Sequence, residues 1–108
     1  MSYDISLNHA ETGEEEWSGN YTSNVWKMLN TAFQAAGLDE WKLIHAMTAN
    51  EARPYLAKAI GHMIQHPEIY EAMNPPNGWG KYETLLPFLT EFWKQMRLYP
   101  DAIVEIDC

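Results

Sequence analysis

A pair of histidines offers the most direct route to chemistry in this sequence. His62 and His66 lie four residues apart in a stretch that predicts a helix, so both imidazoles could face one metal ion. The residues between them include no glutamate, which a zinc protease needs at this spacing as its general base. Met63 and Ile64 belong to the apolar stripe of the same helix and turn the pair toward its flank. We interpret the pair as ordinary helix-surface residues, with a metal site as the weaker alternative.

Nucleophilic and acid–base chemistry find less support. Cys108 is the single cysteine and the last residue, and a free terminus is poorly suited to hold a reactive geometry. None of the serines lies in a nucleophile elbow. Glu14, Glu15 and Glu16 are adjacent, but a flexible loop does not separate the pKa values of its carboxyl groups as acid and base catalysis requires. The sequence therefore favours a non-enzymatic protein, and we expect no cofactor.

Two segments rich in asparagine and aromatic residues, at 18–24 and 74–81, each lead into a predicted helix. Backbone N–H groups and the dipole at a helix N-terminus favour an anion or a carbonyl, while amide side chains and a ring orient a flat ligand. Asn, Ser and Gly are also the ordinary residues of caps and turns, so capping and packing is the stronger interpretation. The candidate ligand or partner residues are Asn20, Tyr21, Asn24, Asn77, Trp79, Lys81 and Glu83.

These residues need a scaffold, and the chain predicts one α+β domain over residues 1–108. Residues 3–7 alternate apolar and polar, and residues 102–106 are rich in β-branched side chains. We therefore expect the two terminal segments to pair in one small sheet. Between them the hydrophobic period is that of helices, so three to four helices should pack on that sheet.

The main helices are predicted at residues 25–36, from the 48–51 segment through residue 64, and at 82–98. Thr48 and Glu51 have the form of a capping box. Residues 38–47 form a short helix or an irregular connection, and Pro67 ends the second helix or begins a short one. Pro87 should bend the last helix or mark its true start.

The charge of the chain bears on its partners. Seven basic against fifteen acidic residues give a net charge of −8. This charge disfavours direct binding to nucleic acid or to anionic membranes, and it suits a protein partner with a basic surface. A solvated acidic surface without a specific partner is the stronger interpretation. The clearest cluster, in a predicted loop, is Glu11, Glu14, Glu15 and Glu16, and Glu105 and Asp107 join it only if the termini meet.

The cysteine count and the first residues bear on the compartment. A lone thiol has no intrachain partner, which fits a reducing environment. The first residues lack the basic and apolar regions of a secretory signal, and no run of about eighteen apolar residues occurs. We expect a cytoplasmic protein with no membrane segment.

Four segments carry a resemblance. They are Tyr-Asp-Ile at 3–5, Gly-Asn-Tyr-Thr-Ser-Asn at 19–24, Asn-Pro-Pro-Asn-Gly-Trp-Gly-Lys-Tyr-Glu at 74–83, and Tyr-Pro-Asp-Ala-Ile-Val-Glu at 99–105. Together they resemble a family of small uncharacterised bacterial and phage-encoded proteins, from whose pattern Pro87 departs. The resemblance implies a cytoplasmic setting, that of the host cell for a phage-encoded protein, and it implies no established activity or site residue.

Three functional hypotheses follow. The leading one is a small acidic non-enzymatic binding protein, of the kind of a phage effector or inhibitor that docks on a host protein. The alternative is a small-ligand or nucleotide-binding protein whose site lies between the loops at 20–24 and 74–81. A metal-dependent enzyme that uses His62 and His66 comes third. Nothing in the sequence indicates an oligomeric state.

Overall fold

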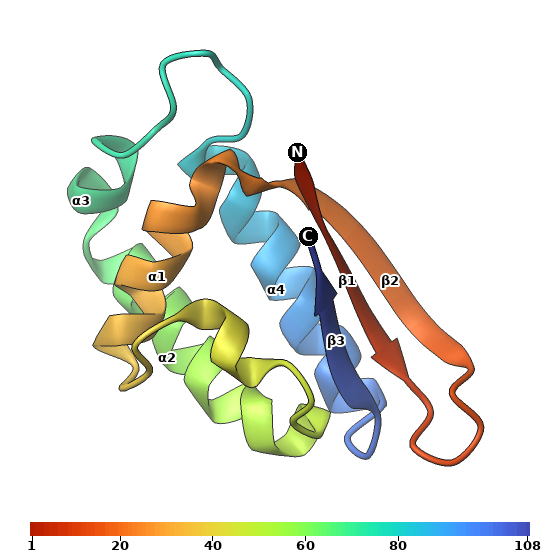
Figure 1. The fold of residues 1–108 in the computed structure, drawn as a ribbon. Coiled ribbons are helices and arrows are strands. Elements are labelled where there is room, and N and C mark those ends of the chain that lie inside the picture. Colours follow the sequence, from red (N-terminus) through yellow and green to blue (C-terminus); the bar gives the residue numbers. More distant parts are fainter.

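The computed structural model describes all 108 residues as an α+β domain, in which helices pack on one face of a three-stranded antiparallel sheet (Figure 1). The strands are β1 (Ser2–Asn8), β2 (Glu15–Thr22) and β3 (Ile103–Asp107), in the order β2-β1-β3. The predicted pairing of the two terminal segments is confirmed, because β1 runs antiparallel to β3 with Asp4 opposite Asp107. The termini therefore meet on the sheet.

Two short 3₁₀ turns and four helices complete the chain: η1 (Ser23–Val25), α1 (Trp26–Ala35), η2 (Trp41–Ile44), α2 (Ala49–Gln65), α3 (Pro67–Glu71) and α4 (Tyr82–Leu98). The capping box is present, with the Thr48 side chain accepting from the backbone N–H of Glu51 and the Glu51 side chain accepting from that of Thr48. Pro67 begins α3. Pro87 lies inside α4 and does not mark its start.

The alternating pattern of β1 divides the sheet into two faces. Tyr3, Ile5 and Leu7 are buried against the helices, while Asp4 between them is exposed on the other face. Beneath the sheet, α2 packs against both α1 and α4. The resulting core of 24 buried residues contains no charged side chain, so every carboxylate lies at or near the surface. No helix is both long enough and apolar enough to span a membrane.

The strand β2 corrects the sequence analysis, which placed residues 11–16 and 18–24 in loops. Residues 15–22 instead form a strand that pairs with β1. A bulge at Glu16 shifts the register, so that Leu7 lies opposite Trp17 and Asn8 lies opposite Glu15. The inner face of β2 is held by rings of α4: Trp17 stacks on Phe92 at 5.3 Å between ring centroids, and Tyr21 lies 5.4 Å from Phe88. Tertiary contacts with α4 therefore stabilise a segment whose composition is typical of a loop.

Candidate binding face on the sheet

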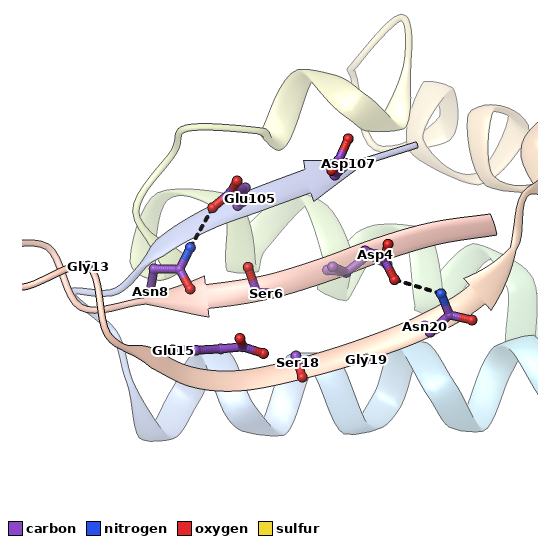
Figure 2. Close-up of a pocket in the computed structure, with 11 residues that line it drawn as sticks. Asp4, Ser6, Asn8, Gly13, Glu15, Ser18, Gly19, Asn20, Glu105 and Asp107 are labelled. Carbon is purple, nitrogen blue, oxygen red and sulfur yellow. Dashed lines mark hydrogen bonds between the residues drawn. The ribbon is translucent and has the colours of Figure 1, made fainter.

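The outer face of the sheet carries no helix and is lined almost entirely by polar side chains (Figure 2). It forms an open hollow of about 690 Å³. The hollow is lined by Asp4, Ile5, Ser6, Asn8, Gly13, Glu15, Ser18, Gly19, Asn20, Glu105 and Asp107. These residues come from all three strands and from the turn between β1 and β2. The period of two along each strand puts the polar side chains of this set on the same side, whereas the side chain of Ile5 is buried on the opposite face.

Four carboxylates gather on this face, contributed by Asp4, Glu15, Glu105 and Asp107. Asp4 lies directly opposite Asp107 in the register of β1 and β3. Like charges at directly opposite positions of neighbouring strands destabilise a sheet. The face includes no lysine, arginine or histidine, so no cationic side chain on it offsets this repulsion. The folded chain thus maintains a concentrated negative surface at some cost.

Two asparagines orient the carboxylates of this face (Figure 2). The side-chain amide of Asn20 donates to Oδ1 of Asp4 at 2.7 Å and to the hydroxyl of Ser2 at 3.1 Å. The amide of Asn8 donates to Oε2 of Glu105 at 2.6 Å. Each bond occupies one carboxylate oxygen and leaves the second free to accept from a ligand. The face is therefore built to accept hydrogen bonds and positive charge.

The carboxylates of the face are not neutralised elsewhere in the chain. No lysine or arginine forms an ion pair with a carboxylate, and the one pairing of this type joins His66 to Glu68 at 3.8 Å. The negative field of the face consequently extends into solvent, where it attracts cations over roughly the Debye length of about 8 Å at physiological salt.

The predicted acidic cluster is divided by the structure. Glu15 lies on the outer face of the sheet, because the bulge in β2 returns its side chain to that side. Glu11 and Glu16 instead line a separate hollow of about 300 Å³ with His9 and residues 99–102. Glu14 lies just before β2, in the turn where its carbonyl accepts from the backbone N–H of His9. The pairing of β1 with β3 places Glu105 and Asp107 on the same face as Glu15.

The segments at 20–24 and 74–81 do come together. The hydroxyl of Tyr21 accepts from the backbone N–H of Lys81 at 3.1 Å and also bonds the hydroxyl of Thr84. Gly80 lies so close to β2 that a Cβ atom there would be 2.5 Å from Cγ2 of Thr22. Asn20, by contrast, points to the outer face of the sheet and away from this junction.

A small hollow of about 300 Å³ lies beside this junction and is lined by Asn24 and Asn77, together with Trp26, Lys27 and residues 73–76. Trp79 is 67% exposed and does not line it. Asn77 accepts from the backbone N–H of Trp79 at 2.9 Å, and Asn74 accepts from that of Tyr82 at 2.8 Å. These amides act as turn and cap residues. Glu83 is exposed in the first turn of α4.

The histidine pair has a packing role in the structure. Nδ1 of His62 bonds the hydroxyl of the buried Tyr70 at 2.6 Å, which ties α3 to α2. The ring of His66 lies 4.5 Å from that of His62, between centroids. No group of three or more histidine, cysteine or acidic side chains is arranged to hold a metal ion. Burial raises the pKa of the Tyr70 phenol to about 12.

Comparison of the chain with protein-family models, with curated proteins and with solved structures finds no match. The resemblance to small bacterial and phage-encoded proteins stays a prediction.

Asp4, Ser6, Asn8 and Ser18 line the face, although none of them was predicted as a site residue. The signal for Asp4 and Ser6 was present, because the alternation in residues 3–7 that predicts a buried side also predicts a solvent side, and Asn8 continues the same period. Ser18 lies in β2, whose strand character the sequence analysis missed.

Proposed function

We propose that this protein is a small acidic non-enzymatic binding protein that docks on the basic surface of a partner protein through the outer face of its sheet. The observation that carries the proposal is the gathering of four carboxylates from three strands with no cationic side chain among them. The family resemblance implies a cytoplasmic setting, and in that setting we propose that the protein acts as an effector or inhibitor of a host protein.

The energetics of the face support a cationic partner. The opposed Asp4 and Asp107 repel each other in the free protein, and a lysine or arginine placed between them would convert this repulsion into attraction. Charge complementarity of this kind raises the association rate and selects among partners more than it raises affinity. Binding should therefore be fast and strongly weakened by salt.

The test compares two variants with the same change in net charge. One neutralises three of the four carboxylates of the face by Asp4→Asn, Glu105→Gln and Asp107→Asn, which leaves the oxygens that accept from Asn8 and Asn20 in place. The matched control neutralises exposed helix carboxylates by Glu68→Gln, Glu83→Gln and Glu91→Gln. Binding to a lysine-rich peptide is measured by titration calorimetry at low and moderate salt. We expect weaker binding and a flatter salt dependence for the first variant alone. Equal effects of the two variants would show that overall charge, and no particular face, determines binding.

A second candidate function is favoured by the hollow between Asn24 and Asn77, which suits a small planar ligand such as a nucleotide base. Trp26 lines this hollow and is 49% exposed, so its fluorescence reports on occupancy. A panel of nucleotides is titrated against the protein and against the Asn24→Ala, Asn77→Ala double variant. Saturable quenching lost in the double variant would support the site, and quenching that is absent or unchanged would exclude it.

A further inference from the structure

The sheet has two edges, and the structure closes one of them. Along β3, the backbone N–H of Val104 donates to the carbonyl of Met47, and its carbonyl accepts from the N–H of Ala46, both at 2.8 Å. The N–H of Ile106 donates to Nδ1 of His45 at 3.0 Å. Segment 45–48, an irregular connection with an isolated bridge between Thr48 and Ile103, therefore covers this edge.

The same bonds define the direction of every backbone group in the sheet. The backbone groups of Val104 and Ile106 point away from β1, toward segment 45–48. In an antiparallel ladder the alternate residues of β3, at 103, 105 and 107, must then bond the residues opposite them in β1, which are Asn8, Ser6 and Asp4. The alternate residues of β1 must then bond β2 through its residues 17, 19 and 21. Ser18 and Asn20 of β2 consequently direct their N–H and C=O groups away from the sheet. No group of the protein bonds these four backbone atoms.

The open edge of β2 is accessible at its centre. The side chains of Ser18 and Asn20 are small, and both residues are exposed. No strand of the chain pairs with the outer edge of β2, and α4 runs along β2 on the inner face of the sheet (Figure 2). The edge lacks the lysines and prolines with which proteins commonly block strand pairing. A row of unpaired donors and acceptors on such an edge is a template for another strand.

We propose that an extended cationic segment of the partner pairs with β2 and becomes the fourth strand of the sheet. This inference rests on the proposed function, since it names how the partner of the same face is held. Alternate side chains of an added strand lie on the outer face, beside Ser18, Asn20 and Glu15. Lysines or arginines at these positions reach the carboxylates of that face. Strand pairing supplies affinity that is independent of sequence, and the face selects positive charge.

The charge of the face decides against a second copy of this chain as the occupant. Edge-to-edge pairing of two copies would place two acidic faces side by side, each on a chain of net charge −8. Repulsion between them opposes self-pairing, whereas a cationic segment is attracted by the same charges. Gly80 and its loop, which pack against Thr22, limit the open edge at one end.

The test uses a peptide of alternating valine and lysine, matched in length to the eight residues of β2. Ser18→Pro removes the outward N–H of that residue and leaves the bonds between β1 and β2 intact, because proline is tolerated at an edge. Ser18→Ala is the matched control, which changes the side chain and keeps the N–H. We expect binding about tenfold weaker for Ser18→Pro than for Ser18→Ala. A peptide methylated at its backbone nitrogens, with the charge unchanged, should bind as weakly.

Hydrogen exchange of the unmodified protein gives a second readout, which decides the matter even if Ser18→Pro fails to fold. The amide hydrogens of Ser18 and Asn20 should exchange rapidly in the free protein and become protected when the peptide is added. Peptide binding with no such protection, and equal affinity of both Ser18 variants, would overturn strand pairing and leave the acidic face as the binding site. Failure of the peptide to bind at all would overturn the proposed function as well. Protection that rises with protein concentration without peptide would identify a second copy as the occupant and refute the cationic segment.

Discussion

The contact between Gly80 and β2 allows the packing that joins the two predicted loops to be tested quantitatively. Gly80 has a φ of +83°, and a Cβ atom built there would lie 2.5 Å from Cγ2 of Thr22 and 2.9 Å from Cγ1 of Val25. Gly78 has a similar φ of +74°, but nothing lies within 4 Å of its Cβ position. Alanine at the two positions thus meets the same backbone strain and different neighbours.

The expected magnitudes follow from these two contributions. A left-handed backbone costs a residue with a side chain about 1–2 kcal/mol, which applies to Gly78→Ala and Gly80→Ala alike. Overpacking adds about 1–3 kcal/mol at Gly80 only. Gly80→Ala should therefore lower the free energy of unfolding by about 2–5 kcal/mol, a large share of the about 5–15 kcal/mol typical of a domain. The smaller conformational freedom of alanine in the unfolded chain affects both variants equally.

Urea denaturation followed by circular dichroism measures both variants and also Thr22→Ser, which removes Cγ2 and keeps the hydroxyl. In the double variant Gly80→Ala, Thr22→Ser, part of the overpacking is relieved, so the two changes should show a favourable coupling of about 1 kcal/mol. If Gly80→Ala costs no more than Gly78→Ala, the close packing of this loop on β2 is refuted. The absence of coupling would show that Thr22 is not the neighbour that resists the added methyl group.

Two further predictions concern α2 and α3. Thr48→Ala should lower the free energy of unfolding by about 1 kcal/mol, because it removes the oxygen that caps the N–H of Glu51, whereas Thr48→Ser should cost little; urea denaturation distinguishes them. Burial raises the pKa of Tyr70 from its ordinary value of 10.0 to about 12, so the folded state holds the phenolic proton more tightly than the unfolded chain. The stabilisation is complete below pH 10 and is lost as the pH rises toward 12. Tyr70→Phe should reduce this alkaline loss in unfolding titrations, and an unchanged loss would contradict the assignment.

The helices were predictable because their signals are local. The apolar residues of α2 and α4 repeat at the spacing of a helix turn, and the capping box at Thr48 and Glu51 depends on residues three apart. The strand β2 was not predictable, since its glycine, asparagine and serine are typical of a loop. Gly19 shows the reason: the ring of Phe88 occupies the space where a side chain would lie, with 2.8 Å between its Cε2 and a Cβ built at that position.

Only part of the candidate site was predictable, because the site is assembled from strands that are distant in the sequence. Glu15 was named as an acidic residue, and Glu105 and Asp107 were assigned to the cluster on condition that the termini meet. Asp4 was overlooked, although the alternation of β1 places it on the solvent side. The loops around Asn24 and Asn77 lie close together, which the alternative ligand hypothesis required, but Trp79 is exposed and does not line their hollow.

The composition and the short-range pattern of this chain are enough to define its negative charge, its main helices and the pairing of its terminal strands. The charge and the helices depend on residue types and on contacts within a few turns of chain. The terminal pairing joins opposite ends of the chain, and it was predictable because each of the two segments has a local strand pattern. The acidic face and the open edge of β2 arise differently. They depend on the register of three strands and on rings of α4 far away in sequence, which hold β2 against β1. Such long-range packing is not encoded in any local window, so the face becomes visible only in the folded chain.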